Sequence, residues 1–240
     1  MLKKIRNNLF LVIRTLLILS IFVNVAIMIV EGLENPDESK AEFFSRITDN
    51  AQLVFWALVT LFLSFGSTLI EKRQKIDIPD ILEIIIVLFI YAGAFLSVQF
   101  NLYYTVFWWD DLLHTLSGVI IGFIGFIVLY KINYKFNMDI SPLLIAFFSF
   151  TFAVTAGVIW EMMEFWCDVF LGTANQKWDL ADTEIMMGKP FQGSGLRDTM
   201  SDLTVDSIGA LITSIITYYM YKHQKKRTLD EMSKMIKDKE

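Results

Sequence analysis

Cysteine and histidine are scarce in this chain of 240 residues. Its one cysteine, Cys167, allows no internal disulfide and no thiolate-rich metal site. Its two histidines, His114 and His223, are too few for a metal centre built from histidine alone. Basic residues are also in deficit, with 21 Lys and Arg against 26 Asp and Glu. This balance excludes the basic surface that nucleic-acid binding requires.

Hydrophobic residues, in contrast, are abundant. They make up 55% of the chain, whereas soluble domains reach roughly 45–50% on a count that also includes glycine. Six segments approach the ~20 apolar residues that cross a bilayer, approximately Leu9–Val30, Ala51–Ile70, Ile81–Phe100, Leu112–Tyr130, Leu143–Trp160 and Leu203–Tyr221. The sequence therefore predicts an all-α fold, a polytopic bundle of six transmembrane helices within one integral membrane domain, 1–240.

Lysine and arginine alternate between the two sides of this predicted bundle. They precede the first span, follow the second, the fourth and the sixth, and are absent from the loop 99–109. Because cytoplasmic loops carry the excess of basic residues, both termini are predicted to be cytoplasmic, in a multi-pass protein of the cell membrane. Spans 1–3, in residues 1–100, are expected to form a scaffold, spans 4–6 lie in 101–222, and 223–240 is a cytoplasmic tail.

Ionisable residues collect at the predicted outer ends of the last three spans. They are spaced three or four residues apart, which places each set on one helix face. The sets are Asp110, Asp111 and His114; Glu161, Glu164 and Asp168; and Asp198, Asp202 and Asp206. At a rise of about 1.5 Å per residue, the three sets lie at the same depth to within about one helical turn.

On each of these three helix faces, small residues follow the ionisable set toward the predicted cytoplasmic side. They are Gly118 and Gly122, Gly157 and Ala153, and Ala210 and Ser214. Small residues allow membrane helices to approach closely. We therefore expect the last three spans to pack along these faces, so that their polar ends converge on one outward-facing pocket.

So many carboxylates cannot all ionise together in a low dielectric, so either several of them are protonated or a cation compensates them. Carboxylates with one imidazole suit a divalent ion such as Zn²⁺, Mn²⁺, Mg²⁺ or Fe²⁺. The predicted metal ligands are His114, Glu161, Glu164 and Asp202, and the predicted catalytic or orienting groups are Asp206, Asp110 and Asp111. Asp198 and the loop cations Lys177, Lys189 and Arg197 are candidates to meet a phosphate or carboxylate head group of the substrate. A solvated loop without chemistry explains the three cations at least as well.

Simpler explanations exist for several of these residues. Asp110, Asp111, Asp198 and Asp202 lie where helices begin, and there an aspartate often only caps free N–H groups. His114 can be a buried neutral histidine bonded to Asp110 or Asp111. Capping does not explain Glu161 and Glu164, because acids at a helix C-terminus oppose the helix dipole.

Three motifs carry a resemblance to a known family. They are Asp110-x-x-x-His114, Trp160-Glu161-x-x-Glu164 and Asp198-x-x-x-Asp202-x-x-x-Asp206-x-x-Gly209-Ala210. In order and topology they resemble YjdF-like integral membrane proteins of bacteria and, more distantly, VanZ-like proteins, whose last helix usually has fewer acids. The resemblance covers about residues 80–222 and implies a role in the cell envelope.

The sequence-based hypothesis is a metal-dependent membrane enzyme. It would hydrolyse or transfer a phosphoryl or acyl group on a membrane lipid or lipid-linked precursor, because a pocket at head-group depth meets lipids first. The chain lacks the Gly-x-Ser-x-Gly and His-Glu-x-x-His motifs of other hydrolases. One alternative is a transporter that uses the same acids as a proton or cation relay. Another is a structural or partner-binding membrane protein.

Overall fold

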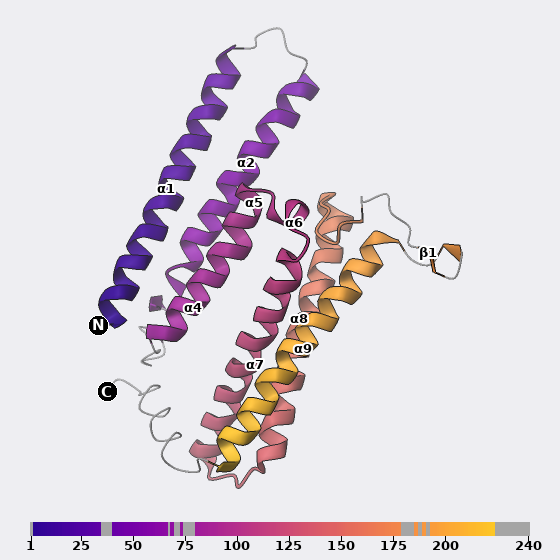
Figure 1. Cartoon of the computed structure of the whole chain (residues 1–240). Helices are drawn as coiled ribbons and strands as arrows, with labels where there is room; N and C mark the ends of the chain where they lie inside the picture. The colour runs from indigo at the N-terminus through magenta and orange to yellow at the C-terminus, as the bar shows by residue number, and fades with distance from the viewer. Residues whose placement is uncertain are drawn as a thin grey trace. The chain divides into compact units, whose positions relative to one another are not determined.

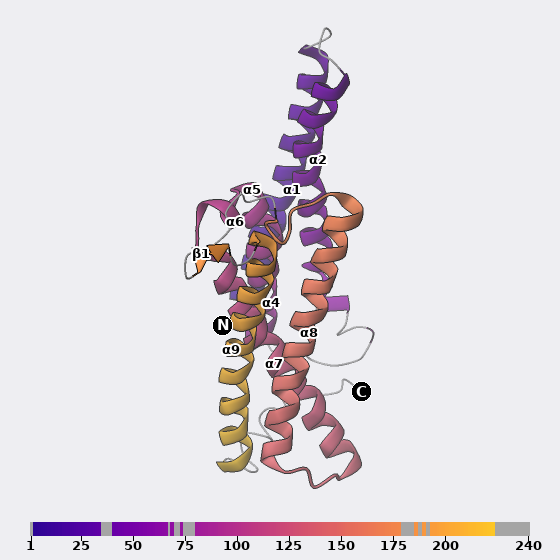
Figure 2. The ribbon, with the colours of Figure 1, turned by 90° about the vertical axis from the view of Figure 1, so that its right-hand side faces the viewer.

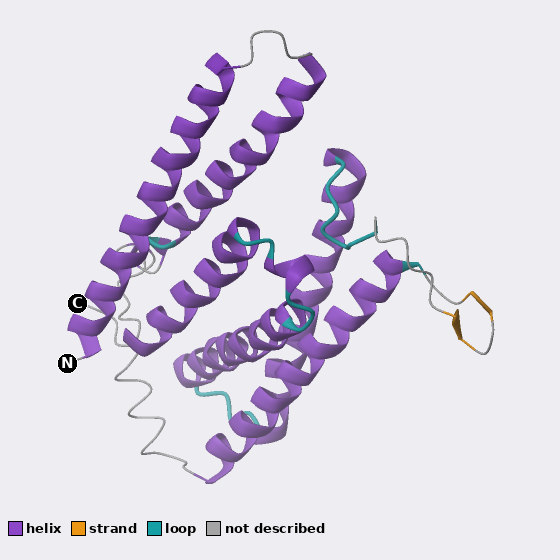
Figure 3. Ribbon diagram, turned by 45° about the horizontal axis from the view of Figure 1, so that its top comes forward, coloured by secondary structure: helices purple, strands orange, loops and turns teal. Residues whose placement is uncertain are grey.

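The structure is a computed structural model, and it describes residues 2–34, 40–66, 68–69, 73, 80–178, 185–186, 189–190 and 193–223. Within these ranges almost every residue is helical, as Figure 3 shows. The two strands there, β1 (Ile185–Met186) and β2 (Lys189–Pro190), form one short antiparallel pair. The predicted all-α fold is confirmed.

Five of the six predicted spans are helices long and apolar enough to cross a membrane, namely Leu2–Gly32, Asp80–Gln99, Trp109–Phe136, Pro142–Leu171 and Ser194–His223. The second predicted span is a shorter apolar helix, Asn50–Leu63. In Figure 1 the helices are α1 (Leu2–Glu34), α2 (Lys40–Leu63), α4 (Asp80–Ile90), α5 (Ser97–Gln99), α6 (Leu102–Thr105), α7 (Trp109–Phe136), α8 (Pro142–Leu171) and α9 (Ser194–His223). A π-helical turn, η1 (Tyr91–Leu96), joins α4 to α5.

Helix α2 ends at Leu63, and the next residues form a turn that binds Arg14, a half-buried residue of α1. The hydroxyl of Ser64 donates to the carbonyl of Leu61, at 2.7 Å. Arg14 of α1 donates to the hydroxyl and to the carbonyl oxygen of Ser64, at 3.1 and 2.6 Å. The arginine thereby satisfies a carbonyl that the helix end leaves open.

The chain forms two compact units, with the boundary between Phe107 and Trp108. In the first unit, α1 packs against α2 and α4. Its buried polar centre is Glu83, which is 1% exposed. Arg6 of α1 forms ion pairs with Glu83 and, at 2.7 Å, with Asp80. An ion pair therefore neutralises the acid inside this unit.

The second unit is a bundle of α7, α8 and α9, each of which packs against the other two (Figures 1 and 2). Glycines bring α7 and α9 into backbone contact. A Cβ atom on Gly118 would lie 2.2 Å from the carbonyl oxygen of Asp206, and one on Gly209 would lie 2.1 Å from that of Thr115. Only glycine fits at these two positions.

Toward the C-terminal end of α9, side-chain hydroxyl groups form hydrogen bonds between the three helices. Ser149 donates to the carbonyl of Gly122 at 2.6 Å, and Thr213 donates to that of Val119 at 3.1 Å. Ser214 donates to the carbonyl of Ala146 at 2.8 Å. These bonds satisfy buried hydroxyls within the protein, as a membrane interior requires.

Candidate functional site

Acidic side chains from all three helices gather at one end of the second unit. Asp110 and His114 lie in the first two turns of α7, where no side chain caps the helix. Asp202 and Asp206 project from the first half of α9, and Glu161 from the second half of α8. All but Asp110 are buried. The acidic side chains of the three helices therefore converge at one end of the bundle, as the helical spacing predicted.

His114 lies between two carboxylates on its Nε2 side. This nitrogen is 3.6 Å from Oδ1 of Asp110 and 3.9 Å from Oδ2 of Asp202. One ligand atom from each of the three residues lies within 4.8 Å of the other two. Ligands of a tetrahedral ion at ~2.1 Å lie about 3.4 Å apart. Asp110, His114 and Asp202 therefore have the chemistry and nearly the spacing of a metal-ligand set.

The other ring nitrogen of His114 faces Asp206. Its Nδ1 is 3.3 Å from Oδ2 of Asp206, and the hydroxyl of Ser117 donates to Oδ1 of the same carboxylate. A Cβ atom on Gly157 would lie 2.7 Å from that Oδ2, so α8 closes over the aspartate. A carboxylate on the far nitrogen fixes the orientation of histidines that bind metals. Asp206 holds this position here.

Replacing Asp206 with asparagine is expected to weaken metal binding by about 10–100-fold, as for other carboxylates behind a metal-binding histidine. Asparagine keeps the shape of the side chain but removes the charge that orients His114. The measurement is a Zn²⁺ or Mn²⁺ titration of the purified full chain. The control is Asp139→Asn, at an exposed aspartate in the loop between α7 and α8. Equal affinity in the two variants would contradict the orienting role.

Glu161 is a buried acid of the same cluster and is 4% exposed. The hydroxyl of Thr199 on α9 is its hydrogen-bonding neighbour, and His114, Asp198 and Asp110 act on it electrostatically. A buried carboxylate is costly unless hydrogen bonds, a cation or a proton compensate it.

Lys177, in the loop after α8, reaches into the cluster. Its ammonium donates to Asp110 and, at 2.6 Å, to Oδ1 of Asp198. Burial alone would lower the pKa of Lys177, but these two carboxylates outweigh it and raise the pKa above its ordinary value. The ion pairs therefore contribute to stability through neutral and mildly alkaline pH, and are lost only as the pH rises through that raised pKa.

Asp168 builds the loop that carries Lys177. Its carboxylate accepts from the hydroxyl of Thr173 at 2.6 Å and from the backbone N–H groups of Asn175 and Gln176 at 2.8 and 3.0 Å. Gly172, with φ 67°, ends α8 just before this turn. The third acid of the α8 column thus shapes the loop and makes none of its hydrogen bonds within the cluster.

Two predicted acids lie at the edge of the cluster. Asp111 accepts from the hydroxyl of Ser201 at 3.2 Å and is outside the group around His114 Nε2. Glu164 accepts from the indole N–H of Trp160, one turn earlier on the same helix, at 2.7 Å. Glu161, His114 and Asp110 still act on Glu164 electrostatically.

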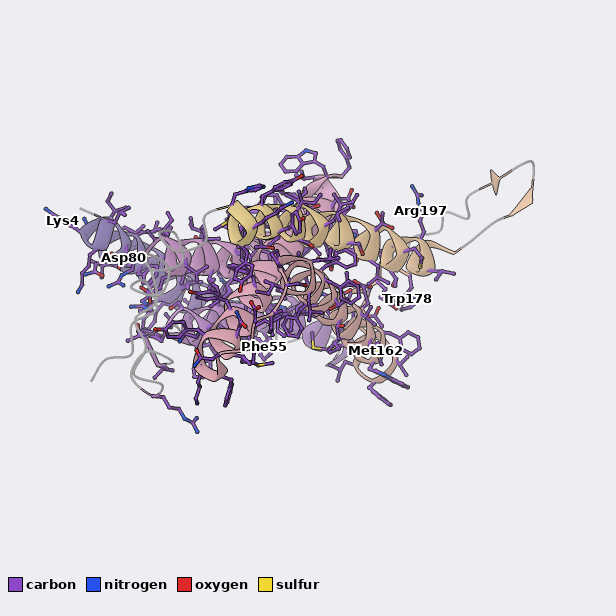
Figure 4. All side chains as sticks on the ribbon, turned by 90° about the horizontal axis from the view of Figure 1, so that it is seen from below. Lys4, Phe55, Asp80, Met162, Trp178 and Arg197 are labelled. Carbon is purple, nitrogen blue, oxygen red and sulfur yellow. The ribbon has the colours of Figure 1, made fainter. Side chains whose placement is uncertain are left out.

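Two of the predicted head-group residues, Lys177 and Asp198, are in contact with each other. Arg197 is exposed and extends away from α9 in Figure 4. The Lys189 side chain lies outside the described part of the chain. Asp198 is held by Lys177. The sequence pattern showed Lys177 only as a loop cation, because no helical spacing connects it to Asp110 or Asp198.

The comparisons with known proteins agree with a membrane protein. The family described as "Predicted membrane protein (DUF2238)", to which YjdF-like proteins belong, matches residues 15–223. An uncharacterised protein of Thermotoga maritima is 25% identical over 154 residues, which are 64% of this chain and 70% of that protein. No solved structure matches. The VanZ-like resemblance stays a prediction. The chain belongs to the DUF2238 family of predicted membrane proteins.

Proposed function

We propose that this membrane protein is a metal-dependent enzyme that hydrolyses or transfers a phosphoryl or acyl group on a lipid or lipid-linked precursor. Asp110, His114 and Asp202 bind one divalent ion, on the extracytoplasmic side. The observation that carries the proposal is the approach of these three ligand atoms to within 4.8 Å of one another. A nitrogen and carboxylate oxygens together favour Zn²⁺ or Mn²⁺, with Mg²⁺ as the all-oxygen competitor.

The neighbours of this ligand set have separate tasks in hydrolysis. Asp206 accepts the Nδ1–H of His114, which leaves the Nε2 lone pair for the ion. When bound, the ion would supply an activated water and polarise the phosphoryl or acyl oxygen. Glu161 would take the proton of the attacking water and pass it to the leaving alcohol oxygen as the bond to that oxygen breaks. A substrate hydroxyl in place of water gives transfer.

A transport function agrees less well with the contacts between the acidic cluster and the opposite end of the bundle. Transport needs polar groups that can pass an ion or proton toward the opposite end of the bundle. The hydroxyls of Ser149, Thr213 and Ser214 donate instead to backbone carbonyls of neighbouring helices. The contacts at Gly118 and Gly209 leave no room for even one extra carbon. These observations favour a site that is open at one end.

A purely structural role for the acids is also disfavoured. Acids that hold helices together need partners on a neighbouring helix. Glu164 accepts instead from Trp160 of its own helix. This hydrogen bond does not join two helices.

The proposal is tested by metal content and turnover of the detergent-purified full chain. Mass spectrometry should find about one divalent ion per chain, and Asp202→Asn should retain less than about a tenth of it, because a ligand is lost. Glu161→Gln should keep the ion but slow phosphate release from phosphatidate in mixed micelles at least about 100-fold. Asp139→Asn should behave as wild type. Folded wild-type protein that binds no Zn²⁺, Mn²⁺ or Mg²⁺ would overturn the proposal.

A further inference from the structure

Arg14 places a positive charge inside the apolar helix Leu2–Gly32 of the first unit. Its side chain is half-buried, and its guanidinium donates to the hydroxyl and carbonyl oxygens of Ser64 at 3.1 and 2.6 Å. Both acceptors are neutral, so a side chain with neutral N–H donors could make the same two bonds. The turn after α2 therefore explains the hydrogen bonds of Arg14 but not its charge.

This charge has no anion of its own within the described residues. Glu83 acts on Arg14 electrostatically, but it forms its ion pair with Arg6. The rings of Phe10 and Phe65 lie 5.4 and 3.8 Å from Cζ of Arg14, and such rings attract a cation without carrying a net charge. Ser64 accepts from two of the five N–H groups, and the other three make no hydrogen bond with the described residues. A charge in a membrane span is costly until an anion neutralises it.

The guanidinium is directed toward the N-terminal end of α1. It lies beside the ring of Phe10, one turn earlier on the helix, as expected because helical side chains point toward the N-terminus. Phe10 is the second residue of the first predicted span, Leu9–Val30, so the charge lies near the edge of the hydrocarbon layer. Long basic side chains reach the membrane interface in this way, and lipid phosphates lie at that interface.

The turn beside Arg14 is open to the surroundings of the first unit. Phe65 is 41% exposed, and its ring is in contact with the half-buried guanidinium. A Cβ atom on Gly66, the next residue, would meet no described atom within 4 Å. A lipid head group can therefore approach the guanidinium beside the turn.

We propose that Arg14, held by the turn at Ser64 and Phe65, binds the phosphate of an anionic phospholipid. The planar guanidinium can donate two parallel N–H groups to phosphate oxygens. A zwitterionic lipid brings a cation of its own, whereas a lipid such as phosphatidylglycerol supplies the net negative charge that Arg14 lacks. Lys3 and Lys4 predict that this end of α1 faces the cytoplasm, where the leaflet is rich in anionic lipids. The inference concerns the first unit and does not depend on the proposed function.

The test is the affinity of the detergent-purified full chain for phosphatidylglycerol, measured by native mass spectrometry over a lipid titration. Arg14→Gln removes the charge and keeps an amide that can donate to Ser64. We expect this variant to bind the lipid at least about fivefold more weakly than wild type. Arg14→Lys keeps the charge and should keep most of the affinity. Lys4→Met removes an exposed base from the same end of α1 and should bind nearly as wild type.

An unchanged affinity in Arg14→Gln overturns the inference. An equal loss in Arg14→Gln and Lys4→Met also overturns it, because the attraction would then belong to the basic end of the chain in general. Inorganic phosphate at millimolar concentration should not displace the lipid, whose acyl chains add to its binding. Displacement would assign the site to free phosphate and overturn the lipid as its ligand.

Wild-type protein provides a second readout that needs no variant. Phosphatidylglycerol should raise the midpoint of its thermal unfolding more than phosphatidylcholine does, because a ligand of the folded state stabilises that state. An equal rise with the two lipids overturns the inference, whether or not Arg14→Gln folds.

Discussion

Alanine in place of Gly209 is expected to destabilise the second unit by about 3 kcal/mol or more, at the upper end of the range for overpacked sites. The added carbon would lie 2.1 Å from the carbonyl oxygen of Thr115, which is a backbone atom and cannot rotate away. Helices α7 and α9 must then separate at the level of His114 and Asp206. We expect metal binding to fall as well, although Gly209 has no side chain to offer an ion.

Thermal unfolding in detergent and a Mn²⁺ titration measure both effects. The matched control is Gly66→Ala, since a Cβ atom there would meet no atom within 4 Å. This control should not destabilise the protein, because in an open helix position alanine is the more stable residue by about 0.5–1 kcal/mol. A Gly209→Ala protein as stable as wild type would show that α7 and α9 are not in backbone contact.

Methionine in place of Arg6 is expected to destabilise the first unit by about 3–5 kcal/mol, the usual cost of leaving a buried charge unpaired. Glu83 is 1% exposed and pairs with Arg6. Asp80, the other partner of Arg6, has a side chain that is 27% exposed and can turn to solvent. The loss should therefore come mainly from Glu83.

A double substitution separates two contributions to the free energy of unfolding. One is the cost of leaving Glu83 buried without its partner, and the other is the net stabilisation by the ion pair. Replacing a whole buried pair with apolar residues is often neutral or stabilising. Arg6→Met with Glu83→Met should therefore recover most of the stability lost in Arg6→Met alone, as measured by thermal unfolding. Arg6→Lys keeps the charge and should lose less. A double variant as unstable as the single one would assign the loss to packing of the arginine stem.

Much of the bundle was predictable, because membrane helices depend on few rules. Long apolar runs predicted the spans, and small residues such as Gly118 and Gly157 predicted the faces that pack together. The second predicted span, Ala51–Ile70, is shorter in the structure. Hydropathy could not indicate its end at Leu63, because the turn at Ser64 is completed by Arg14, a residue far away in the sequence.

The site residues that lie on helices were predictable from their spacing, whereas the residue contributed by a loop was not. Residues three or four apart share a face, which placed His114, Asp202 and Asp206 together. The loop after α8 has no such period, so the approach of Lys177 to Asp110 was not predictable. The same spacing rule also grouped Asp168 with Glu161. Their roles differ because α8 ends at Leu171, beside Asp168, so its carboxylate meets the free N–H groups of the following turn.

The hydroxyl-to-carbonyl bonds of Ser149, Thr213 and Ser214 have a consequence for how such a protein changes over generations. They hold the three helices together in the half of the bundle away from the acidic cluster. Residues that do chemistry commonly reduce stability, and a chain tolerates them only while it stays above the threshold for folding. With its anchoring contacts elsewhere, this bundle can exchange carboxylates at the other end while keeping its scaffold. One arrangement of helices can therefore support several reactions among descendants of a common ancestor.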